Sequence, residues 1–295
     1  MWRNLMRRSG WLLLLFLFVL GIPIAQGSDV LRVPPTILKK LKASGIAKKT
    51  VDLYYSSGTP TKVDVRIILK NVRHREKSAD YRRFLGKKVI QEAKHFLSTN
   101  KYLFAIIERV YHVPREIVVS ILMVETSLGR QKGKYSVLQV YTSLASLLDV
   151  NVRNIVFRQA KKRGEEVASG RFKRRVWRKA KWGWKELICL LKLGAQKRLD
   201  LLRLKGSWAG AFGMPQFVPT SYELYGVDWD VDGKVCLDEI PDAVASVAYY
   251  LQSHGWKKKM SYASALRIIK RYNHSHPYAT TILSMAKALT KKKKR

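Results

Sequence analysis

Apolar residues recur with helical periodicity from Lys88 almost to the C-terminus, and this pattern constrains the fold more than any other feature. In the segment 115–126, Ile117, Val118, Ile121 and Leu122 have the spacing that places them on one face of an α-helix. The same period predicts helices over 89–97, 101–111, 136–148, 187–204, 242–253, 262–272 and 278–289. Few segments alternate in the manner of strands, so the sequence predicts a mostly α protein.

Residues 28–88 differ in character from the rest of the chain. Their predicted elements are short, and Pro34-Pro35 and Pro60 interrupt them. Within this region, residues 63–69 are predicted to be a strand-like or docking segment. We therefore expect an appended N-terminal arm over 28–88 and the principal domain over 89–290.

The chain is strongly basic, with 57 Lys and Arg against 21 Asp and Glu and a formal net charge of +36. Such a surface attracts polyanions, and nucleic acid is the first candidate. The N-terminus argues for another partner, because Arg3, Arg7 and Arg8 precede an apolar run over 11–24 and a small-residue cleavage site at 25–27. We expect residues 1–27 to be a cleaved signal peptide. An uncleaved anchor is the alternative, although the run is short for a membrane span.

Export to the periplasm or cell envelope follows from this expectation. No cysteine stands directly after the apolar run, so no lipid anchor is expected there, and the partners would be anionic envelope polymers rather than nucleic acid. We expect a monomer. Cys189 fits a small core residue, and whether it pairs with Cys236 stays open.

Two basic segments stand out. The tail 291–295 is expected to be solvated. The insertion 158–185 interleaves Phe172, Trp177, Trp182 and Trp184 with lysines and arginines. It is either a surface for an anionic polymer or a solvated helix face whose tryptophans pack inward.

Six of the 21 acidic residues fall between Asp228 and Asp242. Such crowding repels itself unless a cation joins it. Acids stand at positions one, three, five and twelve of a twelve-residue loop with glycine at six, which is the calcium-loop pattern. The sequence thus predicts an EF-hand-like site for a structural Ca²⁺. Its ligands are Asp228, Asp230, Asp232, the carbonyl of Lys234, and Glu239.

Glu125 ends the apolar segment 115–126 and shares the face of its apolar residues. A carboxyl desolvated in this way holds its proton to higher pH and can act as a general acid near neutrality. Further along, residues 205–222 are rich in small side chains, which permit close approach of a polymer to the backbone.

Several motifs recur here in the order found in one family. They are Val113-Pro114 through Val124-Glu125-Thr126, the small-residue segment 206–213 with Gln216-Phe217, the acidic loop, and Ser246-Val247-Ala248 with Tyr250. On these residues the chain resembles the lytic murein transglycosylases. The resemblance covers residues 112–256 and, more loosely, continues to 289. It implies a lysozyme-like α domain with an embedded calcium loop, acting on peptidoglycan glycan strands.

By this resemblance Glu125 is the catalytic acid and base. The positions that match substrate-contacting residues are Ser207, Gln216, Tyr250, Tyr272 and Asn273. Pro215 and Leu128 depart from the family pattern, as do the insertion and the arm. These departures concern glycan register and substrate preference.

Three other functions remain to be distinguished from a lytic transglycosylase. An inactive glycan-binding or scaffold protein could keep the cleft tyrosines without the acid, and a hydrolytic muramidase would share the fold. A nucleic-acid binder is suggested by charge alone.

Overall fold

The computed structural model describes residues 29–290 except 57, 59 and 74–77. The expected signal peptide 1–27 and basic tail 291–295 lie outside the described residues.

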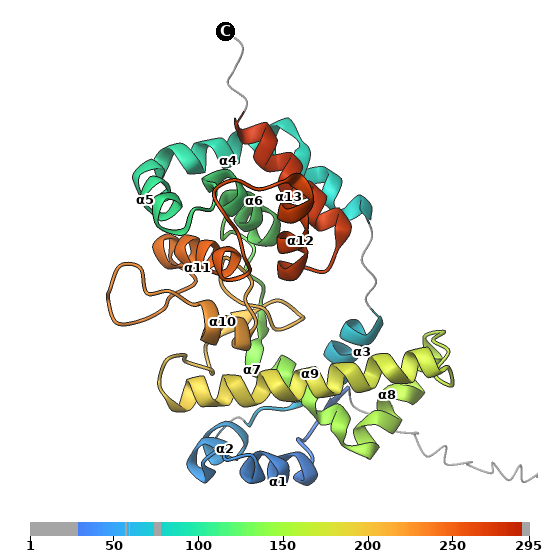
Figure 1. Cartoon of the computed structure of the whole chain (residues 1–295). Coiled ribbons are helices and arrows are strands. Elements are labelled where there is room, and N and C mark those ends of the chain that lie inside the picture. The colour runs from blue at the N-terminus through green and yellow to red at the C-terminus, as the bar shows by residue number, and fades with distance from the viewer. Residues whose placement is uncertain (1–28, 57, 59, 74–77, 291–295) are drawn as a thin grey trace, which may run out of the picture.

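Helices make up most of the described chain, as the periodicity predicted (Figure 1). The N-terminal elements are β1 (Val30–Leu31), α1 (Pro35–Ala43), α2 (Lys48–Tyr55), β2 (Val63–Asp64), α3 (Val65–Arg73) and the 3-10 helix η1 (Ser78–Leu85). The central elements are α4 (Lys87–Thr99), α5 (Lys101–Tyr111), α6 (Arg115–Thr126), β3 (Tyr135–Ser136), α7 (Val137–Ala145), η2 (Ser146–Leu148), α8 (Val150–Lys162) and α9 (Gly170–Ala195). The last elements are β4 (Lys205–Gly206), α10 (Pro219–Tyr225), α11 (Ile240–Ser253), α12 (Tyr262–Tyr272) and α13 (His276–Thr290).

The strands form two short antiparallel pairs. Val30 lies opposite Asp64 in β1–β2, and Tyr135 lies opposite Gly206 in β3–β4. The second pair joins the segment after α9 to the start of α7, so it sets the position of the small-residue loop that follows Gly206.

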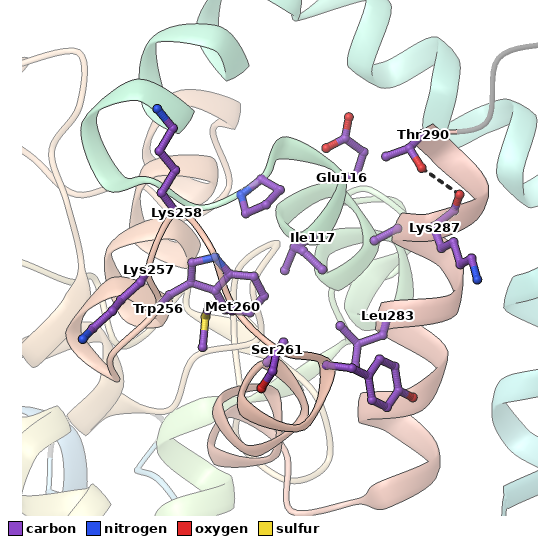
Figure 2. Close-up of a pocket in the computed structure, with 14 residues that line it drawn as sticks. Glu116, Ile117, Trp256, Lys257, Lys258, Met260, Ser261, Leu283, Lys287 and Thr290 are labelled. Carbon is purple, nitrogen blue, oxygen red and sulfur yellow. Dashed lines mark hydrogen bonds between the residues drawn. The ribbon is translucent and has the colours of Figure 1, made fainter.

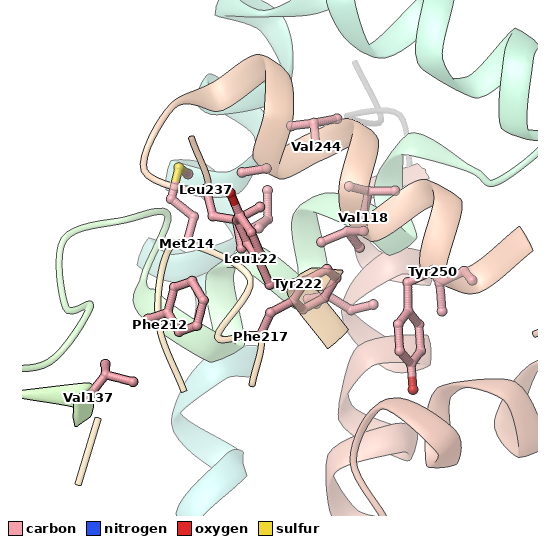
Figure 3. Packing of buried hydrophobic residues seen from close by; sticks show 14 of the residues in the cluster. Val118, Leu122, Val137, Phe212, Met214, Phe217, Tyr222, Leu237, Val244 and Tyr250 are labelled. Atoms are coloured by element: carbon pink, nitrogen blue, oxygen red, sulfur yellow. The ribbon is translucent and has the colours of Figure 1, made fainter. Parts of the chain in front are cut away.

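Helix α6 is the centre of the core. Its residues from Ile117 to Met123 are all buried, and α4, α5, α11 and α13 pack around it. Figure 3 shows Val118 and Leu122 of α6 in one cluster with Phe212, Met214 and Phe217 of the loop after β4. This packing joins the helix that carries Glu125 to the small-residue segment.

The described residues of the segment 28–88 contact the rest of the molecule. The Tyr55 hydroxyl lies 2.9 Å from Oγ1 of Thr142, and the backbone N–H of Asp64 donates a 2.9 Å hydrogen bond to Oγ of Ser143. In Figure 1, α1 and α2 lie on the opposite side of α9 from α10 and α11. The division into arm and principal domain stays a prediction.

Two sequence expectations differ from the structure. Of the two alternatives for the segment 63–69, the strand-like one holds only for Val63 and Asp64, because Asp64 Oδ1 accepts the N–H of Arg66 and starts α3. The helix expected to reach Leu204 ends at Ala195, where Lys197 takes a left-handed conformation (φ 58°). After this turn the buried side chain of Leu201 packs against Gly194. A Cβ on Gly194 would lie only 2.6 Å from Cδ1 of Leu201.

Both cysteines are free thiols. Among the helices of the described residues, none is both long and apolar enough to cross a bilayer.

Helices α7 and α9 cross in close contact at Gly183. A Cβ built there would lie 2.4 Å from Cβ of Leu144. We expect Gly183→Ala to lower the free energy of unfolding by about 1–3 kcal/mol, although alanine is ordinarily the better helix former, because the added carbon overpacks this crossing. Thermal unfolding measures the effect. Gly170→Ala at the first turn of the same helix is the control, since its added Cβ meets only the end of the Arg174 side chain. Equal stability of the two variants would contradict the prediction.

Candidate active site

Glu125 lies in the last turn of α6, and its side chain is half-buried. Tyr278, in the first turn of α13, donates a hydrogen bond of 2.7 Å from Oη to Oε1 of Glu125. The Tyr278 side chain is only 1% exposed. Burial raises the pKa of its hydroxyl well above the ordinary value, and the charge of Glu125 raises it further. The hydroxyl therefore stays protonated and holds the carboxylate in place as a donor.

Tyr272 and Tyr250, both predicted from the sequence, form an aromatic wall with Tyr278. The rings of Tyr250 and Tyr272 meet edge to face with centroids 4.8 Å apart, and Tyr272 lies parallel to Tyr278 at 6.5 Å. Burial raises the pKa of Tyr250 to about 12. Burial, followed by the charge of Glu125, raises the pKa of Tyr272 well above its ordinary value. The wall thus stays neutral beside the carboxylate.

Two hydroxyls of this wall, those of Tyr272 and Tyr250, bind the backbone. Tyr272 Oη donates to the carbonyl of Pro215 at 2.6 Å, and Tyr250 Oη donates to that of Arg271 at 2.8 Å. Phe217 completes the packing, with its ring centroid 5.9 Å from those of both Tyr250 and Tyr272. These bonds fix the loop that contains Gln216 against α12.

The loop after β4 is a tight hairpin built on small residues. Ser207 donates its N–H to the carbonyl of Ala211 at 2.8 Å and accepts the N–H of Ala211 on Oγ at 3.2 Å. Gly210 is left-handed (φ 89°), and a Cβ there would lie 2.5 Å from the ring of Tyr141. The small residues that the sequence singled out are therefore required for close packing of this loop.

Gln216 and Asn273, two polar residues predicted to contact substrate, also bind backbone groups. Gln216 has a positive φ of 52°, and its Nε2 donates to the carbonyls of Gly213 at 3.0 Å and Lys132 at 3.2 Å. Asn273 accepts the N–H of Ser275 on Oδ1 at 3.2 Å. Both side chains thus hold the loops that surround Glu125.

Sequence reasoning missed two residues that build this site, Tyr278 and Thr126. Thr126 Oγ1 donates to the carbonyl of Met214 at 2.9 Å and accepts the N–H of Gly129 at 3.0 Å, which joins the end of α6 to the loop. A signal existed for Tyr278, since it is a tyrosine at a core position of the helix that follows Tyr272-Asn273. Its contact with Glu125, however, spans 153 residues.

The acidic loop gathers three carboxylates, of which Asp228 and Asp230 were predicted and Asp242 was not, while the predicted Asp232 and Glu239 are not in the group. Carboxylate oxygens of Asp228, Asp230 and Asp242 lie within 4.8 Å of one another. Asp242 is 1% exposed and accepts the N–H groups of Trp229 and Cys236 at 2.8 and 2.7 Å. Burial raises its pKa, and the charges of Asp230 and Asp228 raise it further.

The remaining predicted ligands lie around this cluster. Asp232 is exposed and accepts the N–H of Lys234 at 2.8 Å, and Asp228 accepts those of Asp232 and Gly233 at 3.1 and 2.9 Å. Glu239 is exposed at the N-terminus of α11, three residues before Asp242. The hard oxygen donors and the repulsion among them suit a divalent cation such as Ca²⁺.

A separate pocket of about 310 Å³ lies at the opposite end of α6 from Glu125. Glu116, Ile117, Trp256, Met260 and Leu283 contribute to its lining, as Figure 2 shows. None of the residues predicted to bind substrate lines it.

Comparison with known proteins identifies the family. The model of the transglycosylase SLT domain matches residues 35–268. Membrane-bound lytic murein transglycosylase B of Escherichia coli (strain K12) is 37% identical over 150 residues, which are 51% of this chain and 34% of that protein. The alignment therefore spans about a third of the length of this curated relative.

Solved structures share the fold. The lytic transglycosylase SLT35 of Escherichia coli in complex with calcium has a TM-score of 0.65 and 23% identity, covering 86% of this chain and 91% of the other. SltB3 of Pseudomonas aeruginosa in complex with NAG-anhNAM-pentapeptide has a TM-score of 0.66 and 20% identity, covering 86% and 77%. Because the family model matches most of the chain and the solved structures repeat its helices, this chain belongs to the transglycosylase SLT-domain family and has its lysozyme-like, mostly α fold.

Proposed function

We propose that this chain is a peptidoglycan lytic transglycosylase. It would cleave the β-1,4 bond between N-acetylmuramic acid and N-acetylglucosamine without water and leave 1,6-anhydro-N-acetylmuramic acid ends. The observation that carries the proposal is the Glu125 carboxylate, half-buried at the end of α6 and held by the buried Tyr278 hydroxyl. The named activity of the curated relative supports the choice of reaction.

One carboxyl performs both proton transfers in this mechanism. Protonated Glu125 donates to the glycosidic oxygen, and the N-acetyl oxygen of the muramyl sugar stabilises the positive charge that develops at C1. The Glu125 carboxylate then accepts the proton of the muramyl 6-hydroxyl, whose oxygen bonds to C1 and closes the anhydro ring. Glu125 ends the cycle protonated.

Glu116 and Asp149 are the acids that come next before and next after Glu125 in the sequence, and both make other contacts. Glu116 lies nine residues earlier on α6, about 14 Å along the helix axis, and lines the pocket of Figure 2. Asp149 caps α8 by accepting the N–H groups of Asn151 and Val152, and it accepts the hydroxyl of Thr36 at 2.7 Å. Neither acid is therefore placed as the second carboxyl of a two-carboxyl glycosidase mechanism, which agrees with the proposal that Glu125 acts alone.

The surrounding residues would bind and orient the glycan. Ser207 and Asn273 orient the acetamide or the acid, and Gln216 and Tyr250 position the sugar. Tyr272 supplies an apolar wall beside Glu125. The peptidoglycan fragment bound in the SltB3 complex supports a glycan strand as the substrate.

We further propose that the acidic loop binds one structural Ca²⁺. The carboxylates of Asp228, Asp230 and Asp242 would hold it, with Asp232 and the Lys234 carbonyl as further ligands of the loop. Support comes from the clustered carboxylates and from the calcium complex of SLT35. When bound, the cation would neutralise the loop between α10 and α11 and take no part in bond cleavage.

We also propose that the protein acts in the periplasm or cell envelope after loss of residues 1–27, without a lipid anchor. The positively charged residues and apolar run that begin the sequence support export. Peptidoglycan lies in that compartment, so location and substrate agree.

Substitution of the proposed acid tests the reaction directly. Glu125→Gln should leave binding to murein sacculi within a few fold of wild type and reduce cleavage at least about 100-fold, because the amide cannot transfer the proton. Mass spectrometry of the digest counts anhydro ends against reducing ends. Glu116→Gln, on the same helix, is the control and should keep full activity. Anhydro ends released by Glu125→Gln, or reducing ends released by the wild type, would contradict the proposal.

The hydrogen bond from Tyr278 predicts a positioning effect. Tyr278→Phe should lower kcat about 10-fold or more with little change in KM, because a hydrogen bond to a charged group contributes about 1.5–3 kcal/mol. Steady-state kinetics on isolated glycan strands measure both constants. Tyr55→Phe also removes a buried hydroxyl, far along the chain from Glu125, and should lower stability alone. If both variants lost stability and kcat alike, Tyr278 would have only a structural role.

Two variants distinguish the candidate distal ligands of the calcium loop. Added Ca²⁺ should raise the melting temperature of the wild type and of Glu239→Gln, while Asp242→Asn should lose most of this increase. The comparison uses the calcium-induced shift, since Asp242 also stabilises the loop by accepting two backbone N–H groups. The opposite pattern would identify Glu239 as the ligand, and no shift in the wild type would exclude the site.

A further inference from the structure

Helix α9 presents a row of cations to solvent. They are Arg171, Arg174, Arg178, Lys181, Lys185 and Lys192, all exposed, at spacings of three, four, three, four and seven residues. These spacings keep one face of a helix, and the row extends for about 32 Å along its axis. We call these six residues the cationic row.

The opposite face of α9 is fixed in the core, so the row cannot turn inward. Phe172, Val176, Ala180 and Leu187 are at most 1% exposed, and α9 packs along α7. Figure 1 shows α9 as a long helix that crosses the molecule beneath α7 and α10. The cations therefore lie on a rigid, straight support.

Few acids lie near the row. The charge of Lys185 acts on Glu186, and Glu165 and Glu166 line a pocket together with Arg171 and Arg174. Glu186 is the one acidic residue between 170 and 195, and it is 2% exposed, accepting the hydroxyl and N–H of Thr220 at 2.8 and 2.9 Å. Within the described part of the chain, the six cations form no ion pair, whereas Arg175 on the flank of α9 pairs with Glu165 at 3.0 Å. Six exposed charges in one line, none of them in an ion pair among the described residues, favour a ligand with many anionic groups.

Tryptophans border the row on one side. Trp177 is 43% exposed and Trp184 is half-buried, seven residues further on and on the same face. Arg153 lies over the ring of Trp177 at 4.5 Å, and Lys40 over that of Trp184 at 5.3 Å. Each cation covers one face of its ring, which leaves less aromatic surface for base stacking.

Cations in a line beside partly exposed tryptophans are the composition that binds the interface of an anionic bilayer. A straight helix face also matches a flat surface. We propose that the cationic row of α9 docks the protein on a membrane surface rich in anionic phospholipid. This contact is independent of glycan cleavage, and it would hold the enzyme at the membrane surface.

The test is binding to vesicles, with the whole protein. Wild type should bind vesicles of phosphatidylglycerol and phosphatidylcholine far more tightly than vesicles of phosphatidylcholine alone, and the affinity should fall as salt rises from about 50 to about 300 mM. Replacing Arg174, Arg178, Lys181 and Lys185 by Gln should weaken binding at least about 100-fold at low salt, since each cation near an anionic surface contributes about fivefold.

A matched variant keeps the test independent of total charge. Lys257, Lys258, Lys259 and Arg267 are exposed cations around α12, and replacing all four by Gln removes the same charge. This control should lose less than about 5-fold in affinity, the contribution of a single cation near the surface. Both variants should keep the melting temperature of wild type.

Three outcomes would overturn the proposal. They are equal losses in the two variants, wild-type binding without preference for anionic lipid, and a row variant that loses affinity for duplex DNA but keeps its affinity for vesicles. The readout involves no glycan, so failure here would leave the proposed cleavage reaction untouched, and failure of the Glu125 variant to lose cleavage would leave this proposal untouched.

Discussion

The burial of α6 on nearly all its sides organises the rest of the structure. Residues 117–123 of this helix are buried without a break, so helices must enclose it rather than cover one face. α13 does so from the end of the chain, and the same packing brings Tyr278 within 2.7 Å of Glu125. The hydrophobic effect that encloses α6 therefore also builds the candidate site at its C-terminal end.

Backbone carbonyls and N–H groups carry much of the geometry around Glu125. Tyr272, Tyr250 and Gln216 donate hydrogen bonds to carbonyls of the loops and of α12. Such bonds fix the position of rings and loops more firmly than contacts between long side chains would. In the proposed mechanism, the rigid wall of tyrosines limits where a sugar ring can lie relative to the carboxylate.

Acidic and basic side chains are concentrated in different parts of this protein, whose net charge is +36. Asp228, Asp230 and Asp242 lie close together in one acidic cluster. Glu186 is buried, and its carboxylate accepts two hydrogen bonds from Thr220. Cations, by contrast, line the solvent face of α9. The acids thus serve local structure or the proposed cation site, while the excess positive charge is left for partners of the whole molecule.

Helices and the chemical type of the site could be predicted from the sequence, because helical periodicity is local and a carboxylate beside apolar residues is visible in one helix. The bounds of α5, α6 and α12 agree with those predicted over 101–111, 115–126 and 262–272. Predictions from local sequence were wrong or incomplete where contacts between distant residues decide the structure. The side chain of Leu201 packs on Gly194 where α9 ends, and Asp242 joins the acidic residues of the loop. Tyr278 contacts Glu125 although 153 residues separate them in the sequence. The sequence by itself determined which segments are helical and where acid and cation density lie. Only the tertiary structure decided which side chains meet in the site and which face of α9 is exposed to solvent. Both depend on how the apolar faces of helices that are distant in the sequence pack against one another.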